Sequence, residues 1–258
     1  MSTHVRHFAG IVLVAVGAAL VLNVFVIGAI HVPSASMEAT LLSGDFVFVN
    51  KLIYGARSPK YLPFSQSAFP FFRLPKLRDI DRGDVLVFEL PANHSESFSP
   101  RRPYFVKRCV AVAGDTLELR ADKLFINGDQ FRLPGSRRRD SQSMESENYG
   151  PRVVPKRGEY VRLTGESYAE WTGVIRDEGH SIEKDRHGAV LIDGKPADGY
   201  TIERNYLFVI GDNLHHSYDS RSWGFLPEEN VIGEATVVYW SVDPSSGIRW
   251  SRLGSLVH

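Results

Sequence analysis

The most regular pattern in the chain is an unbroken run of apolar residues near its N-terminus. Phe8 to Ile30 holds 23 residues without a charge, and Asn23 is the one strongly polar member. A helix of this length can cross a hydrocarbon core of about 30 Å. A cleavable export signal is the alternative, because Arg6 precedes the run and small residues follow it. The run exceeds the roughly 7–15 apolar residues of such signals, which favours a retained anchor.

Beyond this run the pattern is that of strands separated by turns. Short β-branched or aromatic runs, each bounded by Gly, Asp, Asn or Pro, lie at 46–49, 85–88, 105–112, 117–119, 207–210 and 235–240. Two apolar runs end in Asn127-Gly128 and Asp193-Gly194, dipeptides typical of tight hairpins. No helical periodicity of useful length is evident after the anchor. We therefore expect a mainly β fold.

These patterns suggest an organisation into segments. We expect a short tail over 1–7, a transmembrane anchor over 8–30, a β-rich core over 31–128 and 200–245, a less compact inserted subdomain over 129–199, and a C-terminal tail over 246–258. The stretch from Ser136 to Arg152 is polar and dense in charge, which predicts a mobile surface loop. We expect the N-terminus on the inner side of the membrane and the bulk of the chain on the outer side, with Arg6 as the main positive charge that argues for this orientation.

Residues 61–75 combine aromatic side chains with prolines. The prolines argue against regular structure, whereas aromatic groups are costly to leave in water. The stretch therefore packs on the core or dips into the membrane interface beside the anchor.

Composition narrows the possible partners. The formal net charge is 0 and the pI is about 7.1, so there is no electrostatic reason to expect nucleic acid as a partner. With 258 residues, 43% of them hydrophobic, the portion after the anchor can build a full core. Cys109 is the single cysteine and cannot form an intramolecular disulfide.

Two serines follow the anchor directly, in Pro33-Ser34-Ala35-Ser36-Met37. Ser36 lies six residues past the predicted span, so even an extended chain would hold it within about 20 Å of the bilayer edge. A reactive hydroxyl there could reach only substrates presented at the membrane. The serines equally fit a plain end of the helix after Pro33.

Lys107 lies inside an apolar strand-like segment. Period-two alternation places it on one face with Phe105 and Cys109, while Arg108 points to the other face. Burial beside apolar groups would bring the pKa of the lysine towards the range of about 7–8 that suits a general base. Alternatively, the aliphatic part of the lysine side chain packs in the sheet while its ammonium group reaches water. The strand pattern alone leaves the buried and the solvated lysine both open.

A third cluster follows the strand-like run at 207–210. It is rich in hydrogen-bonding side chains, which is typical of a loop that holds a fixed geometry. From the residues alone, a metal site and a Ser-His-Asp arrangement both stay open. The candidate metal ligands are Asp212, His215, His216 and Asp219, and the candidate bases are the same two histidines.

The order of the motifs narrows these alternatives. The motifs are Pro33-Ser34-Ala35-Ser36-Met37 with Thr40-Leu41 and Gly44-Asp45, Arg82-Gly83-Asp84-Val85, Tyr104-Phe105-Val106-Lys107-Arg108 with Gly114-Asp115, and Gly211-Asp212-Asn213 with Ser217, Asp219, Ser220 and Arg221. They resemble the successive signature boxes of bacterial signal peptidase I. The resemblance covers the anchor and about 31–56, 80–128 and 200–243.

This resemblance implies a membrane-bound serine endopeptidase that removes signal peptides from exported preproteins after small residues. It implies that Ser36 is the nucleophile and Lys107 the general base, without metal or cofactor. The Ser36 backbone N–H and the Ser34 hydroxyl would form the oxyanion hole. The catalytic domain would face the outer side of the plasma membrane, and an extended substrate would add to a sheet edge. Leu41 or Leu42 would help to line the small pockets before the cut.

The same resemblance implies supporting roles in the third cluster. Ser217 would orient the lysine amine, and Asp219 and Arg221 would pair to hold the loop. The chain departs from the family where Leu214 replaces a common arginine and where His215-His216 replace polar residues.

Two rivals remain at this level. One is a catalytically silent, membrane-tethered β-module that binds partner proteins. Another is an enzyme that uses His215 as its base. A Ser-x-x-Lys motif at Ser181 to Lys184 lacks the Lys-Thr-Gly that accompanies it in penicillin-binding enzymes, so we set it aside.

Overall fold

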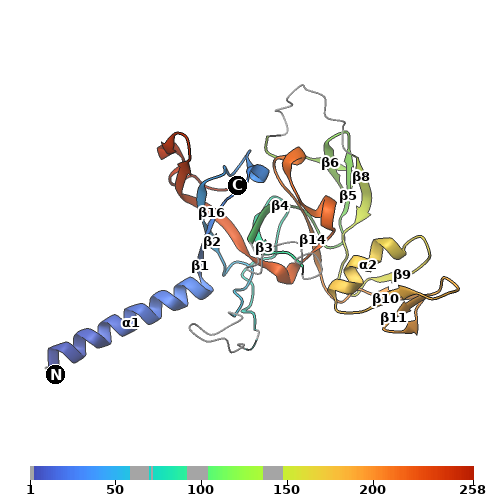
Figure 1. Cartoon of the computed structure of the whole chain (residues 1–258), viewed down its shortest axis with the longest axis horizontal. Helices are drawn as coiled ribbons and strands as arrows, with labels where there is room; N and C mark the ends of the chain where they lie inside the picture. The colour runs from blue at the N-terminus through green and yellow to red at the C-terminus, as the bar shows by residue number, and fades with distance from the viewer. Residues whose placement is uncertain (1–2, 59–69, 71, 92–103, 136–147) are drawn as a thin grey trace.

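The protein consists of one long N-terminal helix that projects from a β-rich body (Figure 1). The structure is a computed structural model and describes residues 3–58, 70, 72–91, 104–135 and 148–258. Most of the aromatic stretch at 61–75, and residues 136–147 of the expected loop, lie outside the described residues. The expectation of a mainly β fold with an N-terminal apolar helix is confirmed.

The N-terminal helix α1 (Thr3–Phe25) is long and apolar enough to cross a membrane over His7–Phe25. Its apolar side chains are open to the surroundings: Phe8 is 69% exposed and Leu13 75%. The apolar run suggested a helix that continues to Ile30, but the helix ends at Phe25. Residues Ile27–His31 form strand β1, which pairs with β2 (Asp45–Asn50). A continuous apolar run does not distinguish a helix from a strand, and here the cross-strand hydrogen bonds decide.

The main sheet is antiparallel, with strand order β1-β2-β16-β3-β4-β14-β15, and β17 pairs with β16. Its remaining strands are β3 (Val85–Glu89), β4 (Tyr104–Val112), β14 (Tyr206–Ile210), β15 (Leu226–Pro227), β16 (Val231–Asp243) and β17 (Gly247–Ile248). The late strand β16 lies between β2 and β3, so the two ends of the sequence meet inside one sheet. The predicted runs at 46–49, 85–88, 105–112, 207–210 and 235–240 all fall within these strands.

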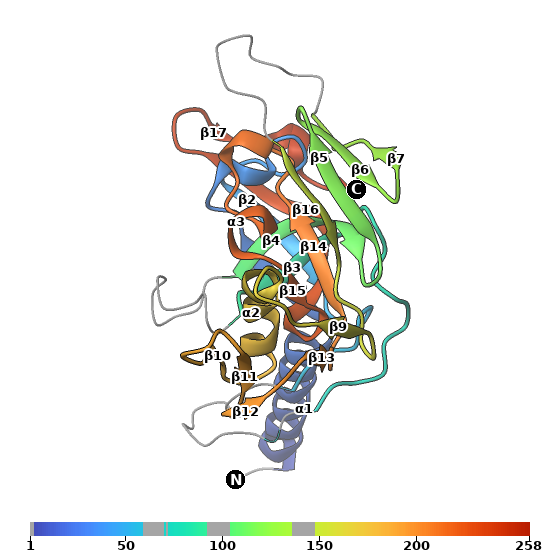
Figure 2. The same ribbon diagram turned by 90° about the vertical axis from the view of Figure 1, so that its right-hand side faces the viewer.

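Smaller sheets occupy the middle of the sequence. A four-stranded sheet consists of β5 (Thr116–Arg120), β6 (Lys123–Ile126), β7 (Asp129–Phe131) and β8 (Tyr149–Val153). A two-stranded sheet pairs β9 (Tyr160–Arg162) with β13 (Gly199–Thr201). A three-stranded sheet consists of β10 (Ile182–Lys184), β11 (Val190–Ile192) and β12 (Lys195–Pro196). In both views the four-stranded sheet lies far from α1 (Figures 1 and 2). Both predicted hairpin turns are confirmed, since Asn127-Gly128 and Asp193-Gly194 have positive φ at both residues.

The inserted region is more regular than its composition suggested. It contains a helix, α2 (Tyr168–Asp177), that the sequence analysis missed, because Thr172-Gly173 weakens its helical pattern. Val174 and Ile175 of α2 are buried in a core cluster that also contains residues of β5, β6 and β14. The described part of the insertion thus contributes to the same core as the strands around it. The loop predicted over Ser136 to Arg152 ends earlier than expected, because Tyr149–Val153 form strand β8, which pairs with β5.

The remaining helical elements of the described residues are short. They are the helix α3 (Ser220–Trp223) and the 3-10 turns η1 (Ala35–Met37), η3 (Leu214–His216), η4 (Glu228–Asn230) and η5 (Trp250–Arg252). Of these, η1 is held by the core: Met37 is 1% exposed and Leu41 0%, and both pack with Val47, Val85 and Val106 of the main sheet. The turn is thereby fixed against the sheet.

A buried carboxylate connects α2 to the main sheet. Glu178 accepts hydrogen bonds from the hydroxyls of Tyr200 (2.6 Å) and Tyr206 (3.1 Å) and from the backbone N–H groups of Glu203 (3.0 Å) and Arg204 (3.1 Å). Only 6% of the residue is exposed. Four donors in three segments thus depend on one side chain.

We expect Glu178→Ala to lower the free energy of unfolding by about 3 kcal/mol, because buried donors would lose their acceptor. Thermal unfolding of the detergent-solubilised protein, followed by circular dichroism, measures this. Glu183→Ala, at an exposed position of β10, is the matched control and should unfold as the parent does. Equal transitions for the two variants would contradict the role of Glu178.

Candidate active site

Ser36 lies in the turn η1, directly after Pro33 and the extended residue Ser34. It is 8% exposed, and its carbonyl accepts a hydrogen bond from the backbone N–H of Asn213 (3.0 Å). The Ser34 Oγ lies 3.3 Å from the Ser36 Oγ. Because α1 ends at Phe25, Ser36 is eleven residues beyond the helix and not six beyond a span. The greatest possible distance from the helix end therefore rises to about 36–40 Å.

Lys107 meets Ser36 from the middle of β4. Its Nζ lies 2.7 Å from the Ser36 Oγ and donates a second hydrogen bond to the Val106 carbonyl (3.1 Å). The side chain is 4% exposed, and its cross-strand neighbour is the fully buried Leu86 of β3. The predicted apolar setting of the lysine is confirmed. The alternative, in which the ammonium group of Lys107 reaches open water, is excluded.

Burial lowers the pKa of Lys107 from 10.5 to about 8. The carboxylates of Asp219 and Asp212 act in the opposite direction, but the loss of hydration outweighs them. At pH 7 roughly one lysine in ten is then neutral, against about one in 2,500 for an exposed lysine. A neutral amine at 2.7 Å can accept the hydroxyl proton of Ser36.

The loop after β14 is held by one buried ion pair. The carboxylate of Asp219 accepts hydrogen bonds from Arg221 Nε (2.8 Å), Arg221 Nη2 (2.8 Å) and the Gly211 N–H (3.1 Å). Arg221 Nη2 also donates to the carbonyl of Leu214 (2.6 Å). The predicted contact between Asp219 and Arg221 is present, and it ties the start of the loop to its end.

Ser217 is close to Ser36 without being bonded to Lys107. Its Oγ is buried and has no hydrogen-bond partner among the described residues. A Cβ built on Gly211 would lie 2.2 Å from this Oγ and 2.5 Å from the Ser36 carbonyl oxygen. Only glycine at 211 therefore allows the two segments to approach. The orienting role of Ser217 stays a prediction.

A second arginine pair lies beside the first, and the sequence analysis missed it. Arg108 Nε and Nη2 each lie 2.7 Å from an oxygen of Asp212, and Nη2 donates to Thr40 Oγ1 (2.9 Å). Arg108 is 3% exposed, so the opposite face of β4, to which the alternation assigned it, is buried as well. Both faces of β4 are covered. The signal in the sequence that could have revealed this pair was Asp212, which closely follows an apolar strand. A carboxylate that is buried there needs a positively charged partner.

These pairs account for the carboxylates of the metal hypothesis. Asp212 is bonded to Arg108 and Asp219 to Arg221, while His215 and His216 are exposed on η3. Within the described residues no group of three His, Cys, Asp or Glu side chains could hold a metal ion. The hydrogen-bond partner of Ser36 that could act as a base is Lys107, and neither histidine contacts the Ser36 hydroxyl within the described part of the chain.

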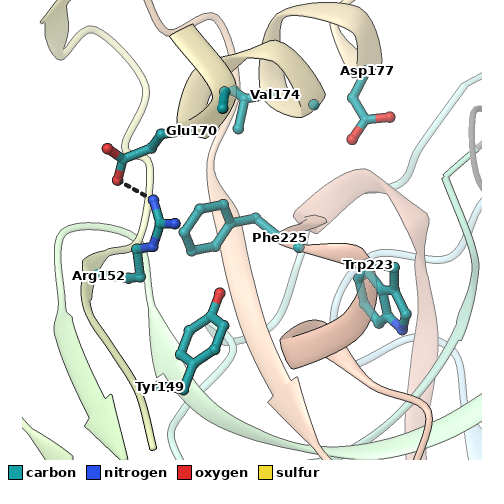
Figure 3. Close-up of a pocket in the computed structure, with 10 residues that line it drawn as sticks. Tyr149, Arg152, Glu170, Val174, Asp177, Trp223 and Phe225 are labelled. Carbon is teal, nitrogen blue, oxygen red and sulfur yellow. Dashed lines mark ion pairs between the residues drawn. The ribbon is translucent and has the colours of Figure 1, made fainter. Parts of the chain in front are cut away.

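A separate cavity of about 210 Å³ opens between α2, β8 and the end of α3 (Figure 3). Its lining residues are Tyr149, Arg152, Ala169, Glu170, Gly173, Val174, Asp177, Trp223, Gly224 and Phe225. An ion pair of 2.8 Å between Arg152 and Glu170 closes one side of it. Neither Ser36 nor Lys107 faces this cavity, so the chemistry of the serine and the lysine lies elsewhere.

The chain matches the family model described as signal peptidase, peptidase S26, over residues 5–240. It is 30% identical over 237 residues to signal peptidase I of Aquifex aeolicus, covering 87% of this chain and 80% of that protein. It is also 30% identical over 237 residues to signal peptidase I of Pseudomonas fluorescens, covering 86% and 68%. A crystal structure of a signal peptidase I from Enterococcus faecalis aligns at 20% identity over 62% of this chain and 100% of that chain. Its TM-score of 0.29 is too low to support the fold or the function.

Replacing the buried lysine tests its surroundings without any substrate. The folded pKa of about 8 lies below the unfolded value, so the unfolded chain binds more protons between these pKa values and stability rises with pH there. Below about pH 8 the buried ammonium is a cost. We expect Lys107→Met to raise the free energy of unfolding by about 1–3 kcal/mol near pH 7, and by less near pH 10.

Thermal unfolding at both pH values measures this difference, with the exposed Lys123→Met as control. Equal stability of parent and Lys107→Met at neutral pH would contradict a dehydrated, largely charged lysine.

Proposed function

The chain belongs to the signal peptidase family, peptidase S26, and we propose that it is a membrane-anchored serine endopeptidase that cleaves signal peptides from exported preproteins. We further propose that it uses a Ser/Lys dyad. The observation that carries the proposal is the 2.7 Å contact between Lys107 Nζ and Ser36 Oγ, with both residues more than nine-tenths buried.

The dyad can perform acyl transfer in two steps. Neutral Lys107 takes the proton of the Ser36 hydroxyl while the Ser36 Oγ bonds to the scissile carbonyl carbon. The resulting ammonium returns that proton to the leaving amine, and the peptide C–N bond breaks. Lys107 then removes a proton from water while the water oxygen bonds to the carbonyl carbon of the ester on Ser36. The ester C–O bond breaks, the Lys107 ammonium returns the proton to Ser36 Oγ, and the acyl group leaves as a carboxylic acid.

The oxyanion of the intermediate needs donors beside Ser36. The Ser36 backbone N–H supplies one, and the Ser34 hydroxyl can supply another, since its oxygen lies 3.3 Å from the Ser36 Oγ. A single donor of this kind often contributes about 3 kcal/mol to transition-state stability. Ser34 lies on extended backbone, two residues before the proposed nucleophile.

The surrounding loop holds the lysine amine in place. Ser217 Oγ has no other partner among the described residues, and a rotation about its Cα–Cβ bond is a small change compared with moving the loop. We propose that it accepts a hydrogen bond from Lys107 when substrate is bound. The Asp219–Arg221 pair fixes the loop from which Ser217 projects.

The location at the membrane and the choice of substrate are part of the same proposal. The apolar helix α1 would hold the catalytic domain at the outer face of the plasma membrane, where signal peptides emerge. Leu41 is fully buried, whereas Leu42 keeps some exposed surface, so Leu42 is the better candidate of the two to contact small substrate side chains.

We expect cleavage of a preprotein with an Ala-x-Ala site to rise about tenfold per pH unit below pH 8 and to level above it, following deprotonation of Lys107. Ser36→Ala and Lys107→Met should each lower kcat/KM by at least about a thousandfold. Detergent-solubilised full-length protein, assayed from about pH 6 to 10, tests both.

His215→Ala is the matched control and should keep parental activity. Activity that survives Lys107→Met but is lost in His215→Ala would identify a histidine base and overturn the dyad. A folded parent without cleavage would favour a silent binding module.

Gly211→Ala should lower kcat by about a hundredfold or more, because the new methyl group would collide with the Ser36 carbonyl and the Ser217 hydroxyl. Gly165→Ala is the control, since nothing lies within 4 Å of a Cβ there. Steady-state kinetics of the two variants compare the effects. A Gly211→Ala enzyme with parental kcat would show that the close approach of these segments is not needed.

A further inference from the structure

The anchor helix and the catalytic sheet are joined without a linker. One residue, Val26, separates Phe25 of α1 from Ile27 of β1 (Figure 1). The N–H of Val26 donates to the carbonyl of Leu22 (2.9 Å), which extends the helical hydrogen bonding. Its carbonyl accepts from the N–H of Lys51 (2.9 Å), which extends the pairing of β1 with β2. Helix and sheet thus meet within a single residue.

Lys51 closes this junction from the side of β2. Its Nζ donates to the carbonyl of Asn23 (2.8 Å) and lies 3.4 Å from that of Val24. The last carbonyls of a helix lack intrahelical partners, and a positive charge there is favoured by the helix dipole. The sheet therefore supplies the cap of the anchor helix.

Gly28 makes room for that cap. A Cβ at position 28 would lie 2.8 Å from Cε of Lys51 and 3.5 Å from Cβ of Val49. The lysine stem therefore runs directly over β1 at this residue. A larger residue would push Lys51 away from the helix end.

An aromatic contact fixes a further side of the helix. The rings of Phe25 and Phe72 stack with centroids 6.1 Å apart. Phe72 is itself held by Ser58, which exchanges hydrogen bonds with it: Phe72 N–H to Ser58 Oγ (3.0 Å) and Ser58 N–H to the Phe72 carbonyl (2.9 Å). The end of α1 is thus contacted by two different segments, one with Lys51 and one with Phe72.

The path from this junction to the nucleophile is also stiff. β1 pairs along its whole length with β2, from Ile27 opposite Asn50 to His31 opposite Phe46. Val32 is 3% exposed in the same core cluster as Met37, next to Ser36. A five-residue strand extends about 17 Å. The height of Ser36 above the end of α1 is therefore set by one paired strand.

We propose that the anchor junction, formed by Phe25, Gly28, Lys51 and Phe72, selects the scissile bond by its distance from the bilayer. This inference rests on the proposed function. A substrate whose own apolar segment lies in the membrane reaches Ser36 only if the extended chain between membrane and cut has the matching length. Each extended residue adds about 3.3 Å, so a site displaced by two residues misses the dyad by about 7 Å. Phe25 and Lys51 act as positioning residues and touch no reacting atom.

The test uses the full-length protein in vesicles of phosphatidylethanolamine and phosphatidylglycerol. The substrate is a membrane-inserted preprotein with several identical Ala-x-Ala sites placed two residues apart, and mass spectrometry of the products maps the cuts. The parent should cut mainly at one site. A Gly-Ser-Gly-Ser insertion between Val26 and Ile27, and separately Lys51→Met, should lower the share of that site about threefold and spread cleavage to its neighbours.

Three controls isolate the junction. Lys51→Arg keeps a charged donor and should restore the parental choice of site. The same insertion after Pro244, in the turn between β16 and β17, should leave the choice unchanged. A short soluble peptide in detergent should be cleaved by every variant with kcat/KM within about twofold of the parent, because the dyad is untouched.

An unchanged distribution of cuts in the insertion variant overturns the inference, whatever Lys51→Met does. If Lys51→Met does not fold, the insertion decides alone, since it removes no side chain. Failure of the parent on the soluble peptide would instead count against the proposed function, and so the two outcomes are distinct.

Discussion

The burial of one ammonium group is the constraint on which the active region depends. Lys107 lies in the centre of a sheet strand, and its Nζ donates hydrogen bonds to Ser36 Oγ and to the Val106 carbonyl. Water is kept from it by β3 on one side and by the turn that carries Ser36 on the other. A lysine in such a place destabilises the fold while it is charged, and that same cost makes its neutral form accessible near neutral pH. Stability and reactivity are thus opposed at a single side chain.

Two buried carboxylates lie near this amine, and each is matched by an arginine. Asp212 pairs with Arg108 and Asp219 with Arg221. Unmatched carboxylates at these positions would hold the lysine in its charged form, since they raise its pKa. Burial is the stronger influence, and the pKa of Lys107 falls to about 8 in spite of the two carboxylates. The two arginines also tie the loop after β14 to its neighbours.

A single mechanical path leads from α1 to the dyad. Val26 belongs to the hydrogen bonding of both helix and sheet, Lys51 caps the helix from β2, and β1 continues without interruption towards Ser36. The late strand β16 pairs with β2 on its other side, so the strand that steadies β1 is itself interior to the sheet. A catalytic domain on a loose tether would sample many heights above a bilayer. With the proposed membrane anchor, the close contact between helix and sheet would hold the domain at a single height.

Much of this protein could be predicted from local pattern. Apolar runs bounded by turn residues located the strands, Asn-Gly and Asp-Gly dipeptides located two hairpins, and alternation in β4 correctly put Lys107 among apolar groups. These features depend on neighbours within a few residues. The sequence alone did not reveal where α1 ends, that α2 exists, or that Arg108 is buried, because each depends on partners distant in the chain. The pair Ser36 and Lys107 is the clearest case. Motifs in the sequence singled out both residues, but only the tertiary structure brings Lys107 Nζ within 2.7 Å of Ser36 Oγ and buries the lysine, which lowers its pKa to about 8.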